Sequence, residues 1–186
     1  AQAVTCLRGD CDNGHSRAIL SNGNSYEGDF VAGLPQGLGV LAFPNGDEYY
    51  GNFHQQYQHG KGRMRFVNGD EYLGDFYKNT MQGHGTMQYA RGDRYQGEWY
   101  AGLPHGEGVL IMVSQDKYQG TFVAGMFHGD GTMYYADGSV YQGQWQYHQK
   151  HGQGVLTLSD GSSQNGWWEA DQLSSEQVLA TSRTSA

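Results

Sequence analysis

Histidines recur at fixed intervals in this chain of 186 residues, and histidine is a common metal ligand and general base. Four of them directly precede a Gly-x-Gly motif, and two others take the middle place of the motif: His59, His105, His128 and His151, then His15 and His84. Equivalent places in successive two-strand repeats of a sheet lie roughly 10 Å apart. Zinc needs its ligand nitrogens at about 2.0–2.1 Å. The pattern therefore predicts hydrogen bonds from histidine to loop backbone and no metal site. His148 and His151 share a loop and could meet, but two ligands are weak evidence.

Aspartates recur at the same position of successive repeats and so form a column, each just after a turn signal: Asp47, Asp70, Asp93 and Asp116. A pair of carboxylates that cleaves a glycosidic bond must lie roughly 5–9.5 Å apart within a cleft. A column with one member per repeat does not supply such a pair. Turn aspartates commonly hydrogen-bond their own backbone, so a structural role is the main expectation, with weak calcium binding as the alternative.

The chain shows no arrangement of residues typical of nucleophilic catalysis. Its serines fall in turns and in the tail, and neither a G-x-S-x-G elbow nor a phosphate-binding loop occurs. The many Gly-x-Gly pairs lack the following helix that a dinucleotide site requires. We therefore expect a protein without enzyme activity, catalytic residues or cofactor.

These columns exist because the chain repeats itself every 23 residues. The clearest column is a set of tyrosines, each followed two places later by glycine: Tyr26, Tyr49, Tyr72, Tyr95, Tyr118 and Tyr141. Six full repeats begin at Tyr26, and partial repeats extend the pattern from Gly14 to Trp168. Fixed-period self-similarity indicates a repeat architecture in which each unit contacts mainly its neighbours.

Alternation within one repeat predicts two β-strands. Tyr72, Gly74 and Phe76 share one face of the first strand, and Leu73 and Asp75 share the other. Turn signals such as Asn45-Gly46 predict type I′ hairpins with two-residue loops. Ser114-Gln115-Asp116 departs from this signal, which predicts a looser hairpin there. The connections are too short for parallel crossovers. The predicted fold is all-β: an elongated, single-layer antiparallel meander of 23-residue hairpins.

The large apolar side chains gather on one face of this meander, together with glycines at which the strands can bend. We expect the face to curl inward and to form an aromatic groove. Its predicted lining is Tyr49, Phe53, Tyr72, Phe76, Tyr95, Trp99, Tyr118 and Phe122. The alternative is a core in which the rings cover one another and the glycine backbone.

Three segments follow from the pattern: a lead-in at 1–13, the repeat array at 14–168 and a cap or tail at 169–186. The lead-in carries the two cysteines, Cys6 and Cys11, for which a disulfide is the main expectation and free thiols the alternative. Ser174-Ser175-Glu176-Gln177 resembles a capping box, which predicts a short helix, and residues 181–186 are expected to be disordered.

Composition narrows the classes of partner and the location. A net charge of −8 argues against nucleic acid and against direct binding to an anionic membrane. No apolar run approaches the roughly 20 residues of a membrane span. The opening Ala1-Gln2-Ala3 is typical of a cleaved signal peptide. We expect a secreted, periplasmic or cell-surface protein, or a cytoplasmic one if the first residue only reflects where the chain was cut.

The repeated motif consists of Tyr-x-Gly-x-(Phe/Trp), followed by Gly-x-Gly and a turn that contains glycine. It resembles the MORN repeat (membrane occupation and recognition nexus) and covers most of the chain. Cys6-x-x-Gly9-Asp10-Cys11 resembles exported bacterial members. The resemblance implies a scaffold or binding surface, since other members bind peptides or helices of partner proteins in their groove. Other members are also fused to lipid kinases or methyltransferases, and we expect no such domain within these 186 residues.

The main functional prediction is a non-catalytic scaffold that binds a protein or peptide partner in the aromatic groove, with homodimerisation as a further expectation. The first alternative is a carbohydrate- or cell-wall-binding module, because stacked aromatic rings suit sugar rings. The second alternative, implied by the family name, is an adaptor associated with membrane lipid.

Overall fold

The structure, a computed structural model, describes residues 4–176, and within this range it contains sixteen β-strands and no helix. The described residues form two compact units, 4–103 and 104–176, called here the first and the second unit. The strands of the first unit are β1 (Thr5–Arg8), β2 (Gly14–Ile19), β3 (Ser25–Val31), β4 (Leu34–Ala42), β5 (Glu48–His54), β6 (Tyr57–Arg65), β7 (Glu71–Tyr77), β8 (Thr80–Gln88) and β9 (Arg94–Tyr100). Those of the second are β10 (Leu103–Ile111), β11 (Lys117–Val123), β12 (Met126–Tyr134), β13 (Val140–Gln146), β14 (Gln149–Thr157), β15 (Ser163–Glu169) and β16 (Gln172–Glu176).

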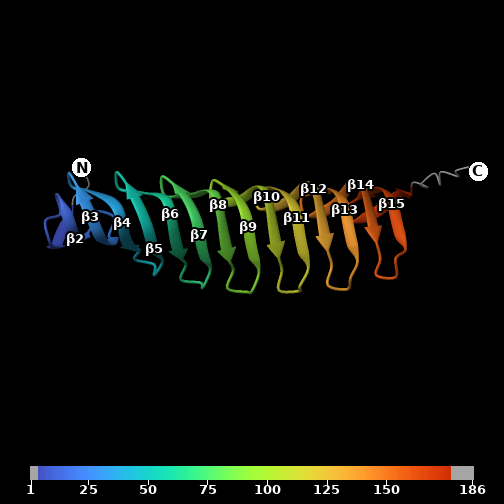
Figure 1. The fold of residues 1–186 in the computed structure, drawn as a ribbon, viewed down its shortest axis with the longest axis horizontal. Helices are drawn as coiled ribbons and strands as arrows, with labels where there is room; N and C mark the ends of the chain where they lie inside the picture. Colours follow the sequence, from blue (N-terminus) through green and yellow to red (C-terminus); the bar gives the residue numbers. More distant parts are fainter. Residues whose placement is uncertain (1–3, 177–186) are drawn as a thin grey trace, which may run out of the picture. The chain divides into compact units, whose positions relative to one another are not determined.

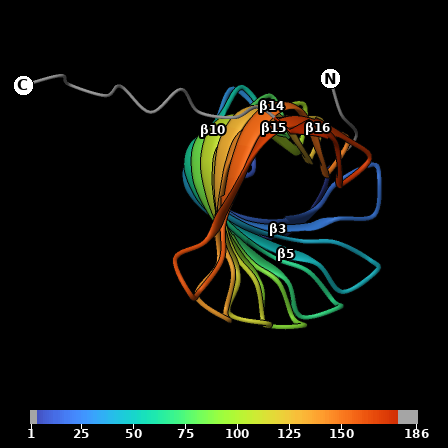
Figure 2. The same cartoon turned by 90° about the vertical axis from the view of Figure 1, so that its right-hand side faces the viewer.

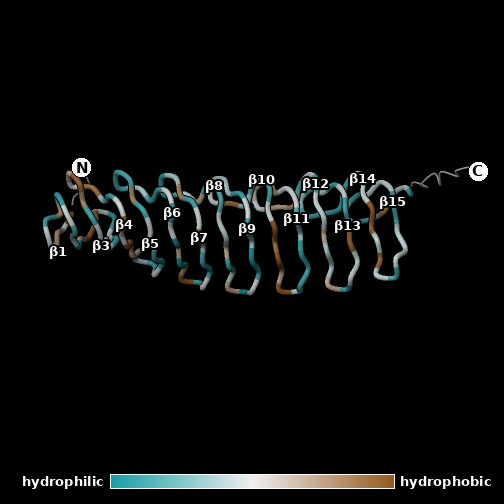
Figure 3. Tube along the Cα trace, in the orientation of Figure 1, coloured by the Kyte–Doolittle hydropathy of each residue, from teal (hydrophilic) through white to brown (hydrophobic). Residues whose placement is uncertain are grey.

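In both units each strand pairs antiparallel with the strand that follows it in the sequence, as the row of arrows in Figure 1 shows. The predicted all-β meander of hairpin repeats is therefore confirmed. Figure 3 shows that no strand is hydrophobic along its whole length, in agreement with strands that bury one face only.

A row of paired glycines crosses each unit. In the first unit Gly28 pairs with Gly39, Gly39 with Gly51, and Gly51 with Gly62. A Cβ atom at Gly62 would collide with the ring of Tyr49. Only glycine therefore allows the tyrosine ring to lie flat on the backbone of the neighbouring strand.

The strands curve at β-bulges next to the glycine row, and Figure 2 shows this curvature. The register shifts between Gly51 and Phe53, and the same shift recurs between Gly74 and Phe76. At the first of these shifts three residues of β6, 59–61, oppose the single residue Asn52 of β5, and the tyrosine hydroxyl donates to the carbonyl of that single residue. The six such bonds have O···O distances of 2.7–3.0 Å and join Tyr26 to Asp29, Tyr49 to Asn52, Tyr72 to Asp75, Tyr95 to Glu98, Tyr118 to Thr121 and Tyr141 to Gln144.

The aromatic rings form the core of each unit. Tyr49 meets Phe53 of its own repeat edge-on, with ring centroids 5.2 Å apart, and Phe76 of the next repeat at 4.9 Å. In the second unit Tyr141 contacts Trp145 and Trp168 in the same way. Such pairs add about 0.5–1.5 kcal/mol beyond burial. Burial also raises the pKa of Tyr49 well above its usual value.

Two kinds of connection alternate along the chain, one between successive repeats and one between the two strands of a repeat, and their turn types differ from the prediction. Asn45-Gly46 does not form a two-residue type I′ turn, because only Gly46 has a positive φ and the loop closes from Phe43 N–H to Asp47 O. The Asn45 side chain accepts from the Asp47 N–H, which fixes this wider loop. Gln115 takes the place of the glycine with a φ of 72°, so the predicted looser hairpin at Ser114-Gln115-Asp116 is wrong: the loop has the same form.

The tight two-residue turns, with positive φ at both central residues, lie instead between the two strands of a repeat. They are Ala32-Gly33, Gln55-Gln56, Lys78-Asn79, Ala101-Gly102, Ala124-Gly125, Tyr147-His148 and Ala170-Asp171. Most of these residues are not glycine and adopt a disfavoured conformation. Hydrogen bonds to an adjacent repeat offset the cost of this conformation. The Asn79 N–H, for example, donates to the Gln58 carbonyl at 3.0 Å.

Two end segments complete the description. In the lead-in, Cys6 and Cys11 are joined by a disulfide, and β1 pairs with β2. The predicted helix start at Ser174–Glu176 is wrong, because these residues belong to β16, which pairs with β15 through the Ala170-Asp171 turn. Its continuation at Val178 and Leu179, and the tail at 181–186, lie outside the described residues.

The tyrosine–bulge bond predicts a specific loss of stability. Tyr72→Phe should lower the free energy of unfolding by roughly 1–3 kcal/mol, because the Asp75 carbonyl at the register shift loses its hydrogen-bond donor. Tyr77→Phe on the same strand is the control, because the Tyr77 side chain is about half exposed (48%). Loss of its hydroxyl should change the free energy of unfolding by less than about 0.5 kcal/mol. Urea denaturation measures both, and equal effects would contradict the role of the bond.

Candidate functional site

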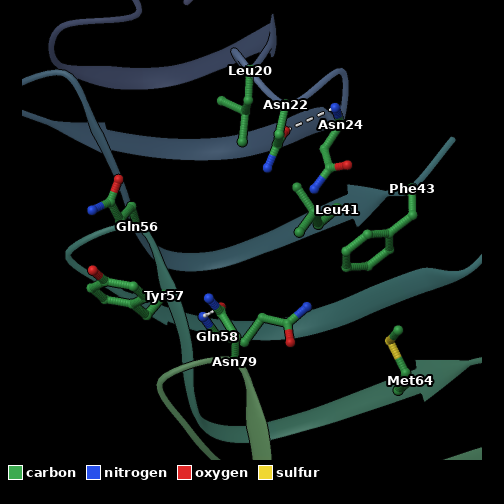
Figure 4. A pocket seen from close by; sticks show the side chains of 10 residues that line it. All are labelled: Leu20, Asn22, Asn24, Leu41, Phe43, Gln56, Tyr57, Gln58, Met64 and Asn79. Atoms are coloured by element: carbon green, nitrogen blue, oxygen red, sulfur yellow. Dashed lines mark hydrogen bonds between the residues drawn. The ribbon is translucent and has the colours of Figure 1, made fainter. Parts of the chain in front are cut away.

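A pocket of about 390 Å³ opens in the first unit (Figure 4). This volume is within the usual range for ligand pockets. Its lining comes from the β2–β3 loop, from β4 and the residue after it, from β6 and from two tight turns. The ten residues are Leu20, Asn22, Asn24, Leu41, Phe43, Gln56, Tyr57, Gln58, Met64 and Asn79.

The apolar part of the lining belongs to the repeat pattern. Leu41 and Met64 occupy equivalent places in successive repeats, and so do Leu20 and Phe43. Leu20, Leu41 and Met64 are buried, and Phe43 is half-buried. The pocket thus has an aliphatic and aromatic floor on which an apolar side chain can be desolvated.

Gln58 breaks the pattern of its column. The equivalent residues in the neighbouring repeats are Pro35 and Met81, so a core position here carries an amide. Gln58 is only 3% exposed. Its backbone N–H donates to Asn79 Oδ1 at 2.9 Å, but its side-chain amide has no hydrogen-bond partner among the described residues. This amide lines the pocket and can pair with a ligand there.

Asn24 is a second buried amide in the pocket, at 7% exposure. In the next repeats the equivalent residues Asp47 and Asp70 accept the backbone N–H of Val67 and of Ala90, at 2.9 and 2.8 Å. The residue that would face Asn24 in this way is Pro44, which has no N–H. The Asn24 side chain therefore lacks the bond that fixes its counterparts, and within residues 4–176 nothing else pairs with it.

The pocket carries no formal charge. Five of its ten residues are amides, four are apolar and one is a tyrosine. This is notable in a chain with a net charge of −8. The site can therefore offer paired donors and acceptors and an apolar floor, but it has no group that would favour an ion.

The residues predicted to line an aromatic groove do not line this pocket. Tyr49, Tyr72, Tyr95 and Tyr118 are 0% exposed, and Phe53, Phe76, Trp99 and Phe122 are at most 5% exposed. Their rings contact one another edge-on and cover the glycine row, so the face that was predicted to be open is filled by its own side chains. The alternative of a self-filled core describes these eight residues, and a partner cannot reach them in this state.

The histidines lie apart from the pocket, and no group of three or more metal-ligating side chains occurs in the described part of the chain. His148 Nδ1 accepts the Phe127 N–H at 3.3 Å, and His105 Nδ1 accepts the Ala124 N–H at the same distance. His59 and His151 contact the rings of Tyr77 and Trp167. His128 contacts Tyr147, His15 lies 3.2 Å from Asp29, and the His84 backbone N–H donates to Asp75.

The turn aspartates have a structural role between repeats. Asp47, Asp70 and Asp116 each accept a backbone N–H from the next repeat with one carboxylate oxygen and a side-chain donor of their own turn with the other. The sequence predicted bonds to their own backbone instead. Asp93 is 5% exposed and contacts Arg91. Sequence reasoning missed the pocket, although a polar residue in an apolar column (Gln58) and a proline at a donor position (Pro44) were visible signals.

Comparisons with known proteins agree with this architecture. The MORN repeat family model matches six consecutive segments: residues 26–48, 49–71, 72–94, 95–117, 118–140 and 141–163. A comparison with curated proteins gives no match. None of the described residues forms a helix suited to crossing a membrane.

Two solved structures are similar to this chain to different degrees. The TCP domain of Drosophila melanogaster SAS-4 (dCPAP), in complex with a proline-rich motif of Ana2 (dSTIL), is 11% identical, with 87% of this chain and 88% of that chain covered and a TM-score of 0.52. The TCP10 domain of Danio rerio CPAP, in complex with a STIL peptide, is 12% identical, with 90% and 84% covered and a TM-score of 0.29. The first shares the fold with this chain.

The His148 bond predicts a pH dependence in the second unit. Partial burial lowers the pKa of His148, so the folded state holds this proton less tightly than the unfolded state. The contribution of neutral His148 to the free energy of unfolding is therefore fully present above the pKa of the unfolded state, about 6.5. It is lost as pH falls through the lower pKa of the folded state. Asn79 makes the equivalent bond with an uncharged side chain, so His148→Asn should lose less stability between pH 7 and pH 5. Urea midpoints at the two pH values measure this, and equal losses would count against it.

Proposed function

Since the chain belongs to the MORN repeat family, we propose that it is a non-catalytic scaffold and that it binds a segment of a partner protein in the pocket of the first unit. The observation that carries the proposal is the pair of buried, unpartnered amides of Gln58 and Asn24 on an apolar floor. Both amides line the pocket and have no side-chain partner among the described residues, so a ligand in the pocket can pair with them.

The nature of the pocket favours binding over catalysis. Its one ionisable group is the Tyr57 phenol, so it supplies neither a general base near neutral pH nor a carboxylate pair. The similar fold of the SAS-4 TCP domain was solved with a proline-rich motif, and this supports a peptide as the kind of ligand that such a sheet can hold. Binding through the buried tyrosine column is not part of the proposal.

A carbohydrate is the second candidate ligand. The five amide side chains around the pocket would suit sugar hydroxyls. The apolar floor of Leu20, Leu41 and Met64 favours an aliphatic side chain instead, whereas a sugar would stack on the rings of Phe43 or Tyr57 at the pocket. A lipid headgroup is disfavoured by the absence of any cation from the lining.

We also propose that the protein works in an oxidising compartment outside the cytoplasm. The Cys6–Cys11 disulfide supports this, because such bonds persist where thiols are not kept reduced. Fractionation of cells that make the full-length protein tests the location: the prediction is an extracytoplasmic protein, and a cytoplasmic protein with reduced cysteines would contradict it.

Peptide selection tests the binding function. Random linear peptides are selected on the immobilised protein, and their affinities are measured by fluorescence anisotropy. Asn24→Phe should weaken the selected peptides by about tenfold or more, because the ring fills the pocket and no hydrogen bond of the Asn24 side chain is lost. Ser139→Phe places the same ring at the equivalent position of the second unit and should leave affinity unchanged.

Thermal unfolding of both variants shows that they remain folded. The proposal is wrong if no peptide is selected above background, or if the selected peptides bind both variants as tightly as the original protein. The same assay with soluble oligosaccharides distinguishes the second candidate: binding of a sugar, blocked by Asn24→Phe, would replace the peptide assignment.

A further inference from the structure

The two pocket amides indicate what part of a partner is recognised. Each primary amide offers donors on nitrogen and an acceptor on oxygen. Gln58 is 97% buried and Asn24 is 93% buried, by subtraction of their exposed fractions of 3% and 7% from 100%. A ligand that displaces water from these amides without pairing with them leaves them desolvated, so they discriminate between ligands.

A main-chain peptide group has the matching pair of functions. Its N–H can donate to an amide oxygen, and its carbonyl can accept from an amide nitrogen. In a helix these groups are already paired within the segment. In an extended or polyproline-type segment they are free, and a polyproline-type segment has no internal hydrogen bonds. The pocket therefore suits an extended segment and not a helix.

The rest of the lining defines the side chain next to that peptide group. Leu41, Phe43 and Met64 form an apolar floor, and none of the ten lining residues carries a formal charge. An acidic or basic side chain would lose its hydration here without gaining a counter-charge. An aliphatic side chain, a methionine or a proline is compatible with the floor.

We infer, on the basis of the proposed function, that Gln58 and Asn24 bind main-chain peptide groups of an uncharged, extended segment of the partner, whose apolar side chain is seated on Leu41, Phe43 and Met64. The partner is thus recognised by backbone hydrogen bonds and one apolar residue. Its affinity depends little on salt, because no ion pair contributes.

Gln58→Met is the matched variant, since methionine is the residue found at the equivalent position Met81. The backbone bonds of Gln58 with Asn79 are kept, and an unpartnered buried amide is replaced by an apolar side chain of similar length. The melting temperature should stay the same or rise, while peptides selected on the original protein should bind about tenfold more weakly. A merely structural role of Gln58 would lower the melting temperature and leave binding of the folded fraction unchanged.

A second measurement isolates the peptide group. Each amide of a selected peptide is replaced in turn by an ester, which removes the N–H and weakens the carbonyl as an acceptor. One ester position should weaken binding to the original protein by about tenfold, and the same ester should have little further effect on Gln58→Met, because the contact is already absent. Raising the salt concentration should leave both affinities nearly unchanged.

The outcomes separate the inference from the function it rests on. If no peptide binds, or if Asn24→Phe does not block binding, the proposed function fails. If peptides bind and Asn24→Phe blocks them, but every ester is tolerated or its cost is the same in Gln58→Met, only the recognition of a peptide group fails. Selected peptides that are helical when bound, or that share an essential charged residue, would also overturn it.

Discussion

The hydroxyl bond from each column tyrosine to the carbonyl of the residue at the register shift is the interaction on which the repeat depends. The bulge bends the strand, and the hydroxyl gives this carbonyl a hydrogen-bond donor. The ring that brings the hydroxyl there must lie against the neighbouring backbone, which is why glycine is required at positions such as Gly62. The same ring then meets one aromatic residue of its own repeat and one of the next. The column tyrosine thus links the curvature of the strand, the hydrogen bonding of its backbone and the packing of the aromatic rings.

The pocket arises where two rules of this repeat are broken together. Between Asp47 and Val67 a side chain in one turn bonds the backbone of the next repeat, but Pro44 offers Asn24 no donor. Gln58 replaces an apolar residue in the inner column. Departures from a local rule that carry a cost are expected at functional sites. Because the surrounding repeats keep the rules, the two amides are held on a rigid frame, as specific recognition requires.

Much of the architecture was predictable from the sequence, because a period of 23 residues and strict alternation leave few folds. The hairpin repeats and the family were predicted in this way and are confirmed. The turn types were wrong, since Asn45 uses its side chain to close a wider loop and residues such as Gln55 and Gln56 accept positive φ. The predicted helix start at Ser174–Glu176 was wrong because a tight turn allows this segment to pair with β15.

The candidate site was less predictable. Whether the tyrosine face is open or filled depends on how far the bulges bend the strands, and composition does not reveal this. The pocket depends on register, because only the pairing of repeats shows that Asn24 faces a proline. Solution NMR of the first-unit side-chain amides, titrated with a selected peptide, tests the account most directly. We predict that the side-chain NH₂ signals of Gln58 and Asn24 shift with saturation at the measured affinity. Shifts confined to other amides, with these two unchanged, would contradict the account.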